Sequence, residues 1–191
     1  DELDKAAAGV DRKMPVMVFV FPGDMSRTFG GGPSRVMSMA GYFRQMGFLT
    51  VLIDRITEGV ATTACEPPLA EHFDLRLGIG RGELPELARM AFDAASRSET
   101  DTAMRKALAG ALEAANGLPE AADLIRRRED PHFQVVAAYL LDRVKPDIVV
   151  ANFAWTAGLL RMLPASVCKI LDTHDIQHLR SEAHTLVGGE A

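Results

Sequence analysis

Continuous apolar runs alternate with amphipathic segments in the first and last thirds of the chain. The runs PVMVFVFP (Pro15–Pro22) and FLTVLID (Phe48–Asp54) have the length and composition of strands buried on both faces. Between them, apolar residues recur at helical spacing in PSRVMSMAGYFRQMG, with Pro33 in the first turn and Gly47 at the end. This pattern predicts two parallel strands joined by a right-handed helical crossover.

The same rhythm returns after Pro131. HFQVVAAYLLDRVK predicts an amphipathic helix, and Asp147–Ala151 predicts a buried strand. AWTAGLLRML predicts a short helix, SVCKILD another strand, and DIQHLRSEAHTL the start of a further helix. Together the segments predict an α/β fold: a Rossmann-like open, mostly parallel sheet with helices on both faces.

The remaining segments lack this rhythm. Residues 1–13 are polar and Ala-rich, which predicts a flexible or frayed helical lead-in to a single domain over 14–191. Residues 55–75 predict loop, with one short strand around Phe73–Leu77. Residues from about 83 to 130 are rich in Ala, Leu, Glu and Arg and predict a helical insertion, in which Arg126–Arg128 form a solvated face.

Composition narrows the class of protein. The net charge of −5 and pI near 5.5 argue against a nucleic-acid partner. Two cysteines without a CxxC pair favour a reducing, cytoplasmic location over a disulfide framework. We expect no transmembrane segment, because no apolar run reaches the ~20 residues that span a bilayer. The chain starts at Asp1 without Met, so we expect a fragment or a processed product.

The glycine-rich segment GDMSRTFGGGPSR follows the first predicted strand, at the edge where open α/β sheets bind ligands. Gly31 and Gly32 would let the backbone approach a ligand closely, and the helix that follows offers N–H groups to a phosphate. Arg35 would add positive charge. The segment fits neither G-x-G-x-x-G nor the P-loop motif. Asp54, at the end of the second strand, is the one feature that favours an NAD-type dinucleotide site.

The segment ANFAW follows a later strand at the same edge. Asn152 could hydrogen-bond a ligand there, and Trp155 could stack on a sugar or pack at the start of a helix.

The segment LDTHDIQHLR ends the last predicted strand. Asp175 is expected to cap the helix that follows, which leaves His174 at the strand-to-helix corner facing the ligand edge. His174 and His178 are four apart, but His174 precedes the cap, so we expect no metal site. Arg180 would bind an anion or pair with an acid such as Glu182.

Taken together, the glycine-rich first loop and KILDTHDIQHLR resemble the N-terminal half of GT-B-fold glycosyltransferases, in the retaining group of family 4 (group 1) enzymes. The matching parts are Pro15–Asp54 and Lys145–Arg180, about half of the chain, and the likeness lies in the order and spacing of the motifs. The helical middle does not contribute to it.

The resemblance implies transfer of a sugar from a nucleotide-sugar co-substrate to a glycan or lipid-linked acceptor, without a metal or other cofactor. It implies that Gly31 and Gly32 approach the donor diphosphate and that His174 lies near the transferred sugar. Arg35, Asn152, Asp175 and Arg180 are the further expected binding residues. A second, C-terminal Rossmann-like domain normally completes such a site, so we expect this chain alone to be catalytically silent.

Two alternatives remain at this stage: a non-catalytic Rossmann-like binding or scaffolding module, and an NAD-type dinucleotide-binding domain. The resemblance would also allow peripheral contact with the inner face of a membrane. Arg126–Arg128 are the one, weak, basic patch for such a contact.

Overall fold

The computed structural model describes residues 2–8, 10, 13–26, 31–57, 60–97, 106, 109–110 and 130–173. The helices are α1 (Glu2–Ala8), α2 (Gly31–Gln45), α3 (Leu84–Arg97), α6 (Pro131–Val144) and α7 (Ala157–Met162), with 3₁₀ helices η1 (Leu69–Glu71) and η2 (Ala154–Thr156). The strands are β1 (Val16–Val20), β2 (Leu49–Ile56), β3 (Val60–Ala64), β4 (Leu75–Gly80), β5 (Ile148–Asn152) and β6 (Cys168–Asp172).

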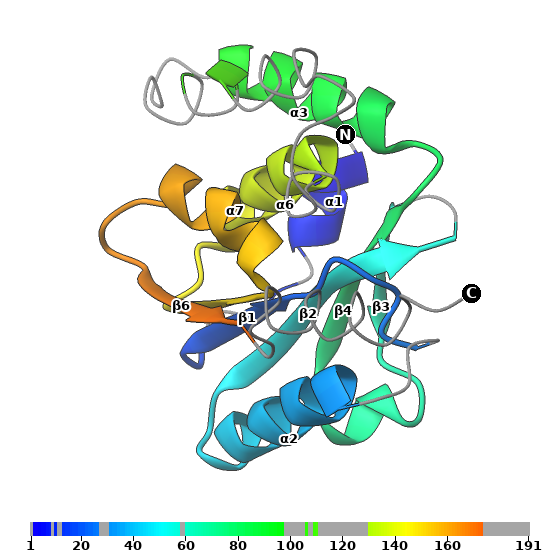
Figure 1. The fold of residues 1–191 in the computed structure, drawn as a ribbon, viewed down its shortest axis with the longest axis vertical. Coiled ribbons are helices and arrows are strands. Elements are labelled where there is room, and N and C mark those ends of the chain that lie inside the picture. The colour runs from blue at the N-terminus through cyan, green and yellow to red at the C-terminus, as the bar shows by residue number, and fades with distance from the viewer. Residues whose placement is uncertain are drawn as a thin grey trace, which may run out of the picture.

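The described strands form one sheet in the order β3-β4-β2-β1-β5-β6 (Figure 1). The pairs β4–β2, β2–β1, β1–β5 and β5–β6 are parallel, and only β3, at the edge beside β4, runs antiparallel. The predicted open, mostly parallel Rossmann-like sheet is therefore confirmed. Strand β1 lies at the centre and is fully buried along its length, as its continuous apolar run requires.

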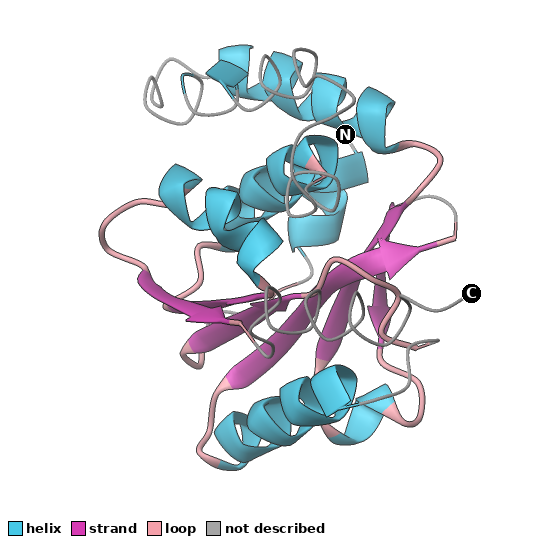
Figure 2. Ribbon diagram, viewed as in Figure 1, coloured by secondary structure: helices cyan, strands magenta, loops and turns pink. Residues whose placement is uncertain are grey.

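Helices cover both faces of the sheet, as predicted (Figure 2). On one face, α2 and η1 pack over the side chains of Met17, Phe19, Leu52 and Val150. On the other face, α1, α3, α6 and α7 enclose the larger core, which includes Val18, Ile53 and Val149. Because alternate residues of a strand point to opposite faces, each central strand contributes to both cores.

Helix α6 is the central helix of the larger layer, and the sequence around it explains its length. The Asp130 side chain accepts a hydrogen bond from the Phe133 backbone N–H, and Pro131 occupies the first turn. Lys145 ends the helix in the left-handed conformation, with φ of 49°. Most of the residues of α6 are buried, which is typical of a helix enclosed by neighbours on several sides.

Residues 1–13 were expected to form a flexible or frayed helical lead-in, and the described part of them includes a packed helix. Helix α1 packs against α6, and Ala7 and Val10 are buried in the larger core. Asp4 of α1 accepts hydrogen bonds from Tyr139 Oη at 2.9 Å and Arg143 Nε at 3.0 Å. The composition allowed a helix here, but seven residues are too few to show the apolar face by which it packs.

The middle of the chain also departs from expectation. The short strand expected around Phe73–Leu77 is β4, but it begins later and continues to Gly80. Strand β3 lies where only loop was expected, since its sequence VATTA has small side chains and no apolar alternation. Of the helical segment at about 83–130, α3 packs on α6, and most of residues 98–129 lie outside the described part. None of the described helices has the length and apolar character needed to cross a membrane.

Candidate functional site

The order of the parallel strands places a topological switch point between β1 and β5. Strand β1 leads to α2 on one face, whereas β5 leads through η2 to α7 on the other (Figure 1). In open α/β sheets, ligands bind outside the carboxyl ends of the strands at such a point. Asn152, the last residue of β5, is therefore the strand residue nearest to the expected ligand position.

Asn152 is fully buried at this point, and its side chain reaches across to β1. Its Nδ2 donates a hydrogen bond to the Val20 carbonyl at 3.1 Å, which ties the ends of β5 and β1 together. Its Oδ1 has no hydrogen-bond partner among the residues that the structure describes. A buried acceptor without a donor costs about 1–3 kcal/mol, so a donor that reached this oxygen would stabilise the switch point.

The backbone after Asn152 is strained and held in place. Phe153 has φ of 73° and ψ of 148°, a backbone region that residues other than glycine rarely adopt. Its ring stacks on Trp155, with 4.6 Å between ring centroids, and lies 5.5 Å from the ring of Phe21. Beneath this turn, Gln134 Nε2 of α6 donates to the Trp155 carbonyl at 3.0 Å.

Of the two roles considered for Trp155, packing is the one that the structure supports. Trp155 is 9% exposed, and its ring face is occupied by Phe153. The half-buried ring of Phe153, which the sequence did not single out, lies closer to the solvent than Trp155 does.

Helix α2 begins at the carboxyl edge of the sheet with Gly31 and Gly32. Both were expected in the loop before the helix, but α2 includes them in its first turn. The first turn contains no acidic side chain that would occupy the N–H groups. A Cβ built at Gly31 would meet no atom within 4 Å, so the space beside this helix end is open.

Arg35, in the second turn of α2, reaches β6. Its Nε donates to Asp172 Oδ2 at 3.1 Å, and the Arg35 side chain is 62% exposed whereas that of Asp172 is 7% exposed. Asp172 pairs with Asn152 in the register of β6 and β5. The structure therefore brings Gly31, Gly32, Arg35 and Asn152 to one edge of the sheet, together with Asp172.

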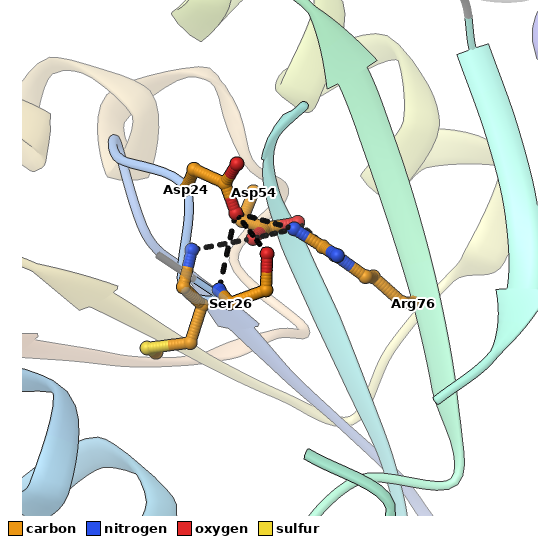
Figure 3. Close-up of polar contacts among 5 residues, drawn as sticks. Asp24, Ser26, Asp54 and Arg76 are labelled. Carbon is orange, nitrogen blue, oxygen red and sulfur yellow. Dashed lines mark hydrogen bonds and ion pairs between the residues drawn. The ribbon is translucent and has the colours of Figure 1, made fainter. Parts of the chain in front are cut away.

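A second cluster, the Arg76 clamp, consists of Arg76, Asp54 and Asp24 and lies on the α2 face of the same edge (Figure 3). Arg76 reaches from β4 to Asp54 of β2, with Nε–Oδ1 at 2.8 Å and Nη2–Oδ2 at 2.6 Å. The same Nη2 donates to Asp24 Oδ1 at 3.0 Å. The clamp thus joins two strands to the loop that follows β1.

The pKa values of the two carboxyl groups of the clamp are shifted in opposite directions. Burial raises the pKa of Asp54, and the hydrogen bonds from Arg76 oppose this effect without cancelling it. Burial also raises the pKa of Asp24, but the hydrogen bonds from Ser26 and Arg76 bring it below its ordinary value. For Arg76, burial favours the neutral form, but the bonds to both carboxylates raise the pKa overall.

The Arg76 clamp bears on the dinucleotide alternative. A ribose-binding acid at the end of β2 must present its carboxylate to the ligand. The side chain of Asp54 is 0% exposed, and both of its oxygens accept hydrogen bonds from Arg76 or Met25. Asp54 is therefore a structural anchor, which removes the main support for an NAD-type site.

The other predicted site residues, His174, Asp175 and Arg180, lie outside the described residues, as does His178. Sequence reasoning passed over Asp24, Arg76, Phe153 and Asp172 as site residues. Arg76 gave the clearest signal, since a charged residue in a buried strand needs a partner and Asp54 is the acid on the neighbouring strand. The described residues contain no group of three or more His, Cys, Asp or Glu side chains that could hold a metal ion.

A cavity of about 460 Å³ lies at the opposite edge of the sheet, between the end of α6 and the segment before β6. Its polar lining includes Asp142, Lys145 and Asp147. Because it lies at the amino ends of β5 and β6, the rule for open α/β sheets does not favour it as the ligand site.

Comparison with models of known protein families gives no match. A search among curated proteins likewise finds no sequence that matches the chain. The functional assignment therefore depends on the geometry of the site and on the motifs of the sequence.

Proposed function

We propose that this chain is the N-terminal, acceptor-side Rossmann-like domain of a GT-B-fold glycosyltransferase. On this proposal, the full enzyme transfers a sugar from a nucleotide-sugar to a glycan or glycolipid acceptor. A second Rossmann-like domain supplies the opposite side of the active site and most of the nucleotide contacts. The enzyme works in the cytoplasm, with peripheral contact to the inner face of the membrane where the acceptor is lipid-linked.

The contact between Arg35 and Asp172 is the observation that carries the proposal. The resemblance to GT-B enzymes depends on two motifs at opposite ends of the chain, the glycine-rich segment with its helix and KILDTHDIQHLR. The ion pair joins a residue of the first to a residue of the second across 137 positions. An active site assembled from both motifs requires them to meet at one edge of the sheet, and this ion pair joins them at the carboxyl end of β6.

The charges at this edge suit a diphosphate. The N-terminal turn of α2 presents backbone N–H groups, including that of Gly32, and the positive end of the helix dipole. Arg35 adds a guanidinium of which, within the described part of the chain, only Nε is engaged. Such positioned donors stabilise the charge that develops on a leaving diphosphate, which is the chemistry that glycosyl transfer without a metal needs.

Asn152 supports a ligand at the same point, because its buried Oδ1 has no donor among the described residues. A hydroxyl group of a sugar or acceptor is a donor of the right kind. His174 follows Asp172 by two residues in the sequence and remains the proposed catalytic residue near the transferred sugar. Asp175 and Arg180 remain proposed binding residues.

A non-catalytic Rossmann-like module is the main alternative, because the same sheet and the same edge would serve it. The two proposals differ in turnover. Only the glycosyltransferase releases a nucleoside diphosphate from a nucleotide-sugar when an acceptor is present.

Arg35→Ala in the full gene product tests the role of this edge. Loss of a charge-assisted hydrogen bond to a phosphate lowers kcat/KM roughly tenfold to a hundredfold. Arg89→Ala is the matched control, since Arg89 is 63% exposed, pairs with Glu86, and lies on α3 away from the carboxyl edge. Equal kcat/KM for Arg35→Ala and Arg89→Ala would contradict the proposed site.

A further inference from the structure

The loop after β1, residues 22–26, lies at the carboxyl edge of the sheet, and hydrogen bonds to charged side chains fix its conformation. Asp24 Oδ1 accepts hydrogen bonds from Ser26 N at 3.1 Å and from Ser26 Oγ at 2.6 Å. Asp54 Oδ2 accepts from Met25 N at 2.8 Å. Two consecutive backbone N–H groups of the loop therefore end on the two carboxylates of the Arg76 clamp (Figure 3).

Arg76 links these two carboxylates. Its Nη2 lies within hydrogen-bond distance of both Asp24 Oδ1 and Asp54 Oδ2. Without this group, two buried carboxylates of like charge would face each other, and their repulsion would push the loop away from β2. The loop is also joined to β2 by the backbone bond from Arg55 N to the Gly23 carbonyl at 3.0 Å. That bond fixes the start of the loop, whereas the clamp fixes its end at Met25 and Ser26.

A similar cluster of an aspartate and an arginine lies at the opposite edge of the sheet, away from the proposed ligand site. Asp74 Oδ2 accepts hydrogen bonds from Thr50 N at 2.8 Å and from Thr50 Oγ1 at 3.0 Å, and Asp74 Oδ1 pairs with Arg44 at 2.8 Å. It joins Asp74 to the start of β2 at the amino ends of the strands. The two clusters share their chemistry and differ in the edge that they serve.

We propose that Arg76 is a positioning residue, which acts through Asp24 to hold residues 24–26 in the conformation that lets the donor diphosphate reach the N-terminal turn of α2. This inference rests on the proposed function for its ligand. It assigns to Arg76, to Asp24 and to the hydroxyl group of Ser26 a role in affinity rather than in the chemical step.

Asp24→Ala is the first test, because it releases Ser26 while the bidentate pair of Asp54 and Arg76 stays intact. Hydrogen exchange of the free protein, followed by NMR, should show the Ser26 amide exchanging at least tenfold faster than in the wild type. In the full gene product, KM for the nucleotide-sugar should rise at least fivefold, with kcat changed less than twofold. Asp24→Asn keeps an acceptor oxygen and should recover most of both effects.

Asp74→Ala is the matched control. It removes three contacts of the same kind at the other edge, so it should lower the melting temperature at least as much as Asp24→Ala and leave KM unchanged. An equal rise in KM for both variants would reduce Asp24 to a structural role and overturn the inference. Ser26 exchange as slow in Asp24→Ala as in the wild type would also overturn it.

The hydrogen-exchange and KM measurements together separate this inference from the proposed function. If the wild-type protein transfers no sugar from any donor, the proposed function fails and the role of Arg76 in donor affinity fails with it. If the wild type is active and Asp24→Ala keeps the wild-type KM, only the inference about Arg76 fails. Exchange of the Ser26 amide decides, in both cases, whether the clamp orders the loop.

Discussion

Arg76→Met is the substitution that most strongly perturbs the carboxyl edge of the sheet. Methionine keeps much of the aliphatic length of arginine but removes the guanidinium that faces Asp54. The Asp54 side chain is 0% exposed, so it would remain as a buried carboxylate without a counter-charge. Breaking a buried ion pair from one side costs about 3–5 kcal/mol. For a chain of this size, that lowers the melting temperature by roughly 6–20 °C.

The pH dependence gives this prediction a second signature. Burial raises the pKa of Asp54 above its ordinary value of 3.8 even with Arg76 present, and removing Arg76 raises it further. A carboxyl group whose pKa is raised on folding stabilises the protein below 3.8, and this contribution is lost as the pH rises through the folded-state pKa. The stability difference between wild type and Arg76→Met should therefore be largest near neutral pH and shrink in acid.

Urea unfolding at several pH values measures this difference, with circular dichroism and the fluorescence of Trp155, the single tryptophan, as probes. The double variant Asp54→Asn/Arg76→Met removes both charges and keeps an acceptor for Met25 N. It should recover about 2 kcal/mol of the loss at neutral pH. The reasoning would be refuted by a loss below about 1 kcal/mol for Arg76→Met. A double variant as unstable as the single one would refute it as well.

Three further predictions address other parts of the chain. The pKa of Asp24 lies below 3.8, so its stabilising effect is present above 3.8 and is lost as the pH falls through the folded-state pKa. The difference in melting temperature between wild type and Asp24→Asn should therefore vanish in acid, and a difference that stays constant with pH would contradict this prediction. Gly158→Ala would bring a Cβ into collision with Gln134 Oε1 and should cost about 1–3 kcal/mol in urea unfolding. Gly82→Ala, where a Cβ meets no atom within 4 Å, should leave the melting temperature unchanged, and equal effects of the two would be a contradiction. Residues 1–191 alone should release no nucleoside diphosphate in an acceptor-dependent assay, and measurable transfer by them would refute the need for a second domain.

The sequence predicted the centre of the sheet well because β1, β2 and β5 are mostly buried. Continuous apolar runs that follow proline or glycine mark these three strands, and Gly47, with φ of 89°, ends the crossover helix as expected. Strand β6 was also predicted, although it lies at the edge of the sheet and most of its residues are exposed. Strand β3 could not be predicted in the same way. It is stabilised by pairing with β4, and its sequence VATTA gives no apolar pattern of its own.

The site was predictable where a residue follows a strand and not where two distant side chains must meet. Asn152 and Arg35 were found from their positions at strand and helix ends. The unpaired Oδ1 of Asn152 and the ion pair of Arg35 with Asp172 depend on register, which sequence alone does not determine. Asp54 shows the converse error, since its position favours a ribose contact and only the structure shows that Arg76 occupies it.

Acceptor-dependent release of nucleoside diphosphate by the full gene product, compared between wild type and His174→Ala, tests the central claim most directly. UDP-, GDP-, ADP- and dTDP-sugars would be supplied with a lipid and glycan extract as the source of acceptor, and folding would be checked by circular dichroism. The account predicts turnover with at least one donor and a loss of at least a hundredfold in kcat for the folded His174→Ala variant. No release from any donor by the folded wild type, or normal turnover by His174→Ala, would contradict it.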